Sequence, residues 1–193
     1  MLVYRLGEWI RHRWAQARCR HQLRQLRLLV LDVDGVLTDG GLWTTESGEV
    51  VKRFDVRDGL GIRLLQNAGL EVALLSGGKS GATEQRARYL GIRHVLTGIK
   101  DKPAALRALQ ASLAISAADT AFVGDDLNDL AVRPAVGLLI ATADAVAPLR
   151  RRADWVLDRR GGHGAVRRLC EAILVARGDW RVLAERGWRD RNE

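Results

Sequence analysis

The stretch "LLVLDVDGVLTDGG", residues 28–41, starts with four apolar residues and then places Asp32, Asp34 and Asp39 within eight positions. An apolar run of this length followed by polar residues predicts a short buried strand that ends at the carboxylates. Crowded carboxylates repel one another, which raises their pKa values unless a cation or a proton intervenes. The stretch therefore predicts a strand that delivers acidic side chains to a cation-binding edge of a sheet.

Length and composition favour one globular domain outside the secretory pathway. The chain has 193 residues and is 47% hydrophobic, enough for one core of ordinary size. Its longest uncharged apolar runs fall well short of the roughly 20 residues of a membrane-spanning helix, and its first arginines come too early for a signal peptide. Cys19 and Cys170 lie far apart without metal-ligand spacing, so neither a disulfide framework nor a thiolate zinc site is predicted. We expect a cytoplasmic protein.

Positive charge is concentrated at the N-terminus. The formal net charge is +8, and residues 1–28 hold seven arginines against one glutamate. Basic patches attract nucleic acid or anionic lipid, but no recognition-helix, RRM or zinc-finger pattern is present, so no nucleic-acid partner is expected. Residues 1–25 are predicted to form a basic amphipathic helix, because apolar residues recur at every fourth position: Leu2, Leu6, Ile10 and Trp14. This helix is expected to pack on the core or on an oligomer, or alternatively to contact the inner face of an anionic membrane.

From residue 28 onward, short apolar runs alternate with helical patterns. Strands are expected at 28–31, 71–76, 94–96, 120–124, 136–140 and 155–157, and helices at 59–69, 81–91, 101–114, 129–135, 145–153 and 165–177. This alternation predicts an α/β fold of right-handed βαβ units, with a parallel sheet covered on both faces. Residues 40–58 break the alternation, because extended-type residues flank "ESG", and they predict a β-hairpin over the ligand-binding edge of the sheet.

Polar residues follow several of the predicted strands and are expected to meet at that edge. They are Asp32 and Asp34 after the first strand, Ser76 after the second, Asp125 and Asp126 after residues 120–124, and Lys102 at the start of a helix. Clustered carboxylate oxygens suit Mg²⁺. The cation would neutralise the repulsion and leave one aspartate as a nucleophile, while a hydroxyl and an ammonium would bind a phosphoryl group.

Four motifs in order, "DVDGVLTDG", "LLSGG", "GIKDK" and "GDDLND", resemble those of the haloacid dehalogenase (HAD) superfamily of phosphohydrolases. "VRDGLGI" and "RRGGHGAVR" extend the resemblance to the 3-deoxy-D-manno-octulosonate (KDO) 8-phosphate phosphatases and their nonulosonate 9-phosphate relatives, over about residues 26–177. The resemblance implies a HAD-like Rossmannoid three-layer fold with a central parallel sheet, a small β-hairpin flap and no large cap domain. It also implies a homotetramer, in which a neighbour's flap or tail helps to close each site; residues 178–193 form the C-terminal tail.

The resemblance also assigns catalytic roles. Asp32 would attack the phosphorus and form an aspartyl phosphate, while Asp34 would protonate the leaving oxygen and then activate water. Ser76 and Lys102 would hold the transferring phosphoryl oxygens. For this phosphate-binding role we prefer Lys102 to the nearby Lys100, because the family motif ends in D-K.

Metal and supporting residues follow from the same resemblance. Mg²⁺ would lie between the Asp32 side chain, the Asp34 carbonyl oxygen and the Asp125 side chain. Asp129 would orient the lysine, and Asp126 would reach the metal through water. Asp39 is interpreted as a turn residue.

The substrate side departs from the family pattern. Gly77 and Arg86 are expected to contact the substrate, the arginine through a sugar-acid carboxylate. Gly78 stands where the family usually has a longer side chain, which leaves the sugar open. The function predicted is that of a Mg²⁺-dependent phosphomonoester hydrolase acting on a phosphorylated sugar acid of the KDO 8-phosphate type, which implies a place in lipopolysaccharide biosynthesis. Alternatives are a nonulosonate 9-phosphate or other small phosphometabolite phosphatase, or a catalytically idle HAD-like domain for assembly or membrane association.

Overall fold

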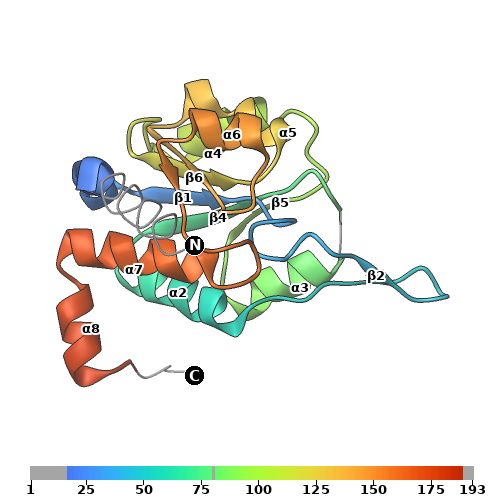
Figure 1. The fold of residues 1–193 in the computed structure, drawn as a ribbon, viewed down its shortest axis with the longest axis horizontal. Coiled ribbons are helices and arrows are strands. Elements are labelled where there is room, and N and C mark those ends of the chain that lie inside the picture. The colour runs from blue at the N-terminus through green and yellow to red at the C-terminus, as the bar shows by residue number, and fades with distance from the viewer. Residues whose placement is uncertain (1–16, 80, 189–193) are drawn as a thin grey trace, which may run out of the picture.

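The computed structural model describes residues 17–79 and 81–188 as an α/β structure built on one central sheet (Figure 1). Its six strands are all parallel, in the order β5-β4-β1-β6-β7-β8. The strands are β1 (Leu28–Leu31), β4 (Glu71–Leu75), β5 (His94–Leu96), β6 (Thr120–Gly124), β7 (Leu138–Ala141) and β8 (Trp155–Val156). The predicted α/β architecture with a central parallel sheet is confirmed.

Helices cover both faces of the sheet. They are α2 (Val56–Asn67), α3 (Gly81–Tyr89), α4 (Lys102–Leu113), α5 (Leu127–Leu130), α6 (Ala147–Arg152), α7 (Ala165–Arg177) and α8 (Trp180–Arg186). Figure 1 shows α2, α3 and α7 on one side of the sheet and α4, α5 and α6 on the other. This is the three-layer arrangement expected for βαβ units with short parallel strands.

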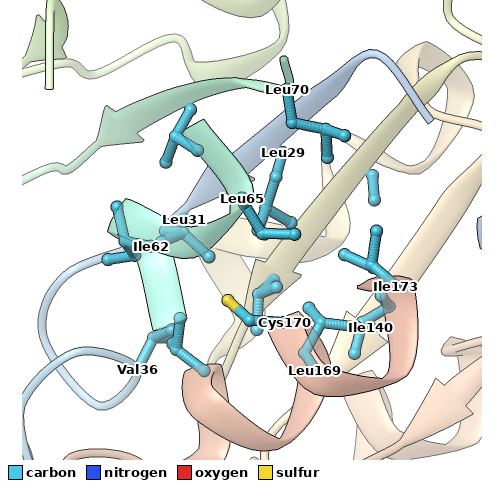
Figure 2. Packing of buried hydrophobic residues seen from close by; sticks show 14 of the residues in the cluster. Leu29, Leu31, Val36, Ile62, Leu65, Leu70, Ile140, Leu169, Cys170 and Ile173 are labelled. Atoms are coloured by element: carbon cyan, nitrogen blue, oxygen red, sulfur yellow. The ribbon is translucent and has the colours of Figure 1, made fainter. Parts of the chain in front are cut away.

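The central strand β1 is buried on both faces, which explains its uninterrupted apolar sequence. Leu29 and Leu31 belong to the apolar cluster under α2 and α7, and Leu28 and Val30 to the cluster under α4 and α6. Figure 2 shows the first cluster, in which Leu65 of α2 and Cys170 of α7 lie close to the strand residues. Because β1 pairs with β4 and β6, its carboxyl end lies at the middle of the sheet edge.

One predicted helix is wrong. Residues 129–135 do not form a single helix, because α5 ends at Leu130 and a separate 3₁₀ turn spans Arg133–Ala135. Pro134 lies in that turn and has no backbone N–H, so it cannot continue the hydrogen-bond ladder of α5. The chain instead makes a tight turn before β7, which keeps α5 short and close to the sheet edge.

The N-terminal segment contributes to the core where the structure describes it. Residues 17–25 are helical, and Cys19, Leu23 and Leu26 are buried within the cluster under α2 and α7. The predicted amphipathic repeat of residues 2–14 lies outside the described residues. Among the helices that the structure describes, none combines the length and hydrophobicity needed to cross a membrane.

The predicted hairpin is present as two short antiparallel strands, β2 (Trp43–Thr44) and β3 (Val50–Val51). Figure 1 shows it projecting from the carboxyl edge of the sheet. All four strand residues are exposed. The base of the hairpin returns to the body of the protein, where Arg53 Nη1 lies 3.7 Å from Asp39 Oδ2 and donates a hydrogen bond to Gly162 O at 3.4 Å.

The loop before α7 supports the loop that follows β1. Gly162 N donates to Val36 O at 2.9 Å, and Gly161 lies so close to the same loop that a Cβ on it would overlap Gly35 O. Gly161 has no positive φ, so its need for glycine is steric rather than conformational. The "GGHG" stretch therefore positions the backbone that carries the aspartates.

Gly161→Ala tests this support. The added methyl group must displace the loop after β1, so we expect a loss of about 1–3 kcal/mol in the free energy of unfolding. Urea denaturation of the variant and of Gly81→Ala measures it. Gly81 also lacks a positive φ but has open space around its Cβ, so its alanine variant should stay within about 0.5 kcal/mol of the parent. Equal effects of the two substitutions would contradict the proposed support.

Candidate active site

A cavity of about 500 Å³ opens at the carboxyl ends of β1, β4 and β6. Residues predicted for the site line it from three separate loops: Asp32, Asp34, Ser76, Gly77, Asp125 and Asp126. Asp32 and Ser76 are buried at its floor, whereas Asp34 is partly exposed. Parallel strands bring these residues together because all of them end at the same edge.

Lys102 is the cation at the floor of this site. Its side chain is 3% exposed, and its Nζ donates to Asp32 Oδ1 at 2.9 Å and to Asp129 Oδ1 at 2.6 Å. Asp101 caps α4 by accepting a hydrogen bond from Ala104 N, which places Lys102 in the first turn of the helix. The competing Lys100 is exposed, so the structure places the preferred lysine beside the aspartates.

Both carboxylate oxygens of Asp129 accept hydrogen bonds. Its Oδ1 accepts the Lys102 hydrogen bond, and its Oδ2 accepts from Asp125 N at 2.9 Å. Gly124 makes this approach possible, because a Cβ there would collide with the Asp129 carboxylate. Asp126 has a different position, since its side chain caps α5 by accepting from Leu127 N.

Burial and mutual repulsion raise the pKa values of two of the carboxylates. Burial, followed by the charge of Asp129, raises the pKa of Asp32 to about 6, although Lys102 opposes the shift. Burial and the charges of Asp32 and Asp129 raise the pKa of Asp125 to about 7. Burial alone would lower the pKa of Lys102, but the two neighbouring aspartates outweigh it and raise that pKa. One ammonium thus faces three carboxylates.

The donor set fits a magnesium ion. Asp32, Asp125 and Asp129 each offer an oxygen atom, and these atoms all lie within 4.8 Å of one another. The Asp125 carboxylate lies against Gly35, where a Cβ would collide with it, so the backbone leaves room for an oxygen-lined site. Oxygen ligands with excess negative charge are what Mg²⁺ requires. Both oxygens of Asp129 already accept hydrogen bonds, from Lys102 Nζ and from Asp125 N, so Asp32 and Asp125 are the side chains best placed to hold the ion.

Lys52 is a site residue that the sequence interpretation missed. Its Nζ donates to Asp34 Oδ1 at 2.7 Å and to Asp34 Oδ2 at 2.9 Å. The lysine belongs to the base of the hairpin, and no motif connects it with an aspartate 18 residues earlier. The available signal was its positive charge, because Lys52 lies in the hairpin segment that was predicted to overhang the aspartates.

Arg86 lies outside the catalytic cavity. It lines a separate hollow between the hairpin and α3, where its guanidinium lies 5.7 Å from the Phe54 ring centroid and 5.5 Å from that of Tyr89. Burial lowers the pKa of Arg86. The structure thus does not bring it together with Ser76 and the aspartates, and its contact with substrate stays a prediction. Asp39 is an exposed turn residue that accepts a hydrogen bond from Gly41 N at 3.0 Å, as interpreted from the sequence.

Asp58 is a second missed residue, with a supporting position. It is buried in the first turn of α2, and its Oδ1 accepts a hydrogen bond from Arg167 N at 2.7 Å, in the first turn of α7. Burial raises the pKa of Asp58 to about 6, although that hydrogen bond opposes the shift. The carboxylate therefore joins the first turns of two helices just behind the "GGHG" loop. No signal in the sequence indicated this contact, because an aspartate in the first turn of a helix is common and Arg167 is far away along the chain.

Comparison with known proteins gives consistent relatives. A family model described as haloacid dehalogenase-like hydrolase matches residues 55–137. The 3-deoxy-D-manno-octulosonate 8-phosphate phosphatase KdsC of Escherichia coli K12 is 46% identical over 153 residues, which cover 79% of this chain and 81% of that protein.

Solved structures agree with these relatives. The same phosphatase from Yersinia pestis has a TM-score of 0.82 at 41% identity, covering 84% of this chain and 88% of the other. The enzyme from Moraxella catarrhalis, solved with a magnesium ion, a phosphate ion and a KDO molecule, has a TM-score of 0.85 at 34% identity, with 87% and 97% covered. A magnesium ion is thus present in a structure that shares this fold.

The carboxylate cluster predicts how pH and metal change stability. Because the folded-state pKa values of Asp32 and Asp125 lie above 3.8, the folded protein binds protons more tightly than the unfolded chain. Its stability should therefore fall as pH rises from about 4 to about 7. Without divalent cations, Asp125→Asn should raise the melting temperature at pH 8 by about 3 °C or more, and by less at pH 5.

Magnesium provides the second half of this test. It should raise the melting temperature of the parent protein more at pH 8 than at pH 5, and should have little effect on Asp125→Asn. Thermal melts in EDTA or Mg²⁺ measure both effects. Asp126→Asn is the matched control for the metal-free melts, because asparagine preserves the cap of α5. The same magnesium effect on the parent and on Asp125→Asn would contradict the assigned metal site.

Proposed function

The chain belongs to the 3-deoxy-D-manno-octulosonate 8-phosphate phosphatase family of haloacid dehalogenase-like hydrolases, and we propose that it hydrolyses the phosphate ester of KDO 8-phosphate. It is a HAD-family phosphatase, and enzymes of this family use Mg²⁺. The observation that carries the proposal is the convergence of Asp32, Asp34 and Ser76 on one cavity. Lys102 contacts Asp32 there, and the neighbouring carboxylates form a group that could hold a metal ion.

Asp32 is the nucleophile in this proposal. Its Oδ1 accepts a hydrogen bond from Lys102, and the residue lines the catalytic cavity. Attack on phosphorus forms an aspartyl phosphate and breaks the bond to the sugar oxygen. The ammonium of Lys102 partly offsets the effect of burial on the pKa of Asp32, and in this proposal it also contacts a phosphoryl oxygen.

Asp34 is the acid and base. It lies two residues after the nucleophile and lines the same cavity, so one carboxyl group serves both halves of the reaction. It gives a proton to the leaving sugar oxygen, and then takes one from the water that hydrolyses the aspartyl phosphate. Ser76 Oγ, buried at the end of β4, is placed to donate to a phosphoryl oxygen.

Mg²⁺, held by the Asp32 and Asp125 side chains and the Asp34 carbonyl oxygen, would shield the phosphate dianion from the nucleophile's charge. The presence of KDO in the Moraxella catarrhalis structure supports a sugar acid as the substrate class. Because Gly78 replaces the longer side chain that is usual in the family, nonulosonate 9-phosphates and other small phosphometabolites are alternative substrates. Turnover rates on different phosphate esters distinguish these alternatives. A place in lipopolysaccharide biosynthesis stays a prediction.

Asp32→Asn tests the reaction. The amide keeps the shape of the side chain and loses the attacking charge, so phosphate release from KDO 8-phosphate should fall at least about 10³-fold. The matched control is Asp39→Asn, which removes an exposed carboxylate from the same loop and should stay within about threefold of the parent.

Phosphate release is measured in the presence of Mg²⁺ on three esters: KDO 8-phosphate, a nonulosonate 9-phosphate and the phosphate of a hexose that has no carboxylate. Turnover by Asp32→Asn within tenfold of the parent would refute the role of Asp32. Failure of the parent to hydrolyse any of the three esters would favour the catalytically idle domain.

We also propose a homotetramer built through the hairpin. Several apolar side chains on and beside the hairpin are exposed, including Trp43 at 71% and Val56 at 79%. A cluster of exposed apolar residues on a projecting hairpin favours contact with another protein surface. Light scattering should give about four times the mass of one chain, and Trp43→Glu should lower it, whereas Val175→Glu on α7 should not. An active monomer would contradict this assembly.

The proposed location is the cytoplasm, in keeping with a soluble sugar phosphate as substrate. Peripheral membrane contact stays a prediction that rests on the arginine-rich sequence of residues 1–25. Sedimentation with anionic lipid vesicles tests it, and no binding at low ionic strength would reject it.

A further inference from the structure

Lys52 is a buried cation whose only described partner is one carboxylate. Its side chain is 3% exposed, and its Nζ donates to both oxygens of Asp34. An ammonium has three N–H donors, and among residues 17–79 and 81–188 no further acceptor contacts this one. A buried charge is costly unless its hydrogen bonds are satisfied. The position therefore leaves Lys52 able to donate a further hydrogen bond to an anionic or polar oxygen.

The contact has a direct consequence for Asp34. Both of its carboxylate oxygens are engaged by Lys52, although 36% of the Asp34 side chain faces solvent in the cavity. A group that protonates a leaving oxygen must form a hydrogen bond with that oxygen. The two contacts with Lys52 therefore compete with the hydrogen bond that Asp34 has to form with the leaving oxygen.

Lys52 also lines a second hollow, which adjoins the hairpin. This groove has a volume of about 820 Å³ and lies between the hairpin and α3. Three of its lining residues are cationic, Lys52, Lys79 and Arg86, and Glu49 is the one carboxylate among them. Such an excess of positive charge attracts an anionic group. Lys52 thus connects an anion-attracting groove with the acid and base of the catalytic cavity.

Gly78 leaves room for Asp34 to move. It has no positive φ, so its backbone does not require glycine. A Cβ at this position would lie 3.2 Å from Asp34 Oδ2 and 3.7 Å from Ser76 Oγ. The missing side chain therefore keeps open the space between Asp34 and the phosphate-binding hydroxyl.

We propose that Lys52 is a positioning residue that makes hydrolysis depend on a second anionic group in the substrate; this rests on the proposed function. In the free protein Lys52 holds Asp34 by both oxygens. A sugar acid that places its carboxylate in the hairpin groove engages Lys52, and Asp34 then turns into the space beside Gly78 and reaches the leaving oxygen. A phosphomonoester without a second anionic group leaves the Lys52–Asp34 pair intact and reacts slowly.

The test compares two esters with similar alkyl leaving groups, KDO 8-phosphate and glucose 6-phosphate, on the full-length protein with Mg²⁺. Lys52→Met keeps the apolar stem and removes the charge. It should lower kcat/KM for KDO 8-phosphate about tenfold or more and raise kcat for glucose 6-phosphate about threefold or more. Lys52→Arg should retain most of the preference for the sugar acid, because it keeps a cation in place.

Lys79→Met is the matched control, because it removes a positive charge from the same groove without a hydrogen bond to Asp34. It should not raise turnover of glucose 6-phosphate. Equal losses on both esters in Lys52→Met, or no change on either, would overturn the proposal. If the parent enzyme hydrolyses both esters equally well, the coupling fails while the phosphatase assignment stands. If it hydrolyses neither, the proposed function itself fails.

Discussion

Three neighbouring carboxylates, two of them buried and bonded to one ammonium, are the constraint on which the site depends. Asp32, Asp125 and Asp129 converge at the edge of the sheet, and among residues 17–79 and 81–188 Lys102 is the one cation that bonds to them. The raised pKa values of Asp32 and Asp125 express the cost of this arrangement. A divalent cation would relieve the repulsion, so in the proposed mechanism the cluster can hold the metal and keep Asp32 charged at the same time.

The surrounding fold keeps this unfavourable cluster in place. β1 is anchored between β4 and β6, so the loop that carries the aspartates starts from the most buried strand. The loop before α7 packs against the same segment through Gly161, and Asp58 ties the first turns of α2 and α7 together behind it. On the open side, the base of the hairpin supplies Lys52, which bonds to the partly exposed Asp34. The cluster is thus supported from within the fold, and the hairpin projects on its open side. This arrangement suits a site for the proposed sugar phosphate.

The sequence was most informative where local pattern and motif coincide. The apolar run of β1 and the aspartates after it, with Lys102 near Pro103, predicted both the sheet edge and the residues that meet there. Contacts between distant segments left no such signal. Lys52 reaches Asp34 only because the hairpin folds back, and Asp58 reaches Arg167 N across 109 positions. The helix expected at 129–135 failed because Pro134 outweighed its helical pattern.

The central claim is that Asp32 becomes covalently phosphorylated. Asp34→Asn with p-nitrophenyl phosphate tests it most directly, because nitrophenolate leaves without a proton while hydrolysis of the aspartyl phosphate still needs the missing base. Peptide mass spectrometry after a rapid acid quench should find the phosphoryl group on Asp32. A phosphoryl group on another residue, or nitrophenol release with no covalent phosphate on the protein, would contradict the account.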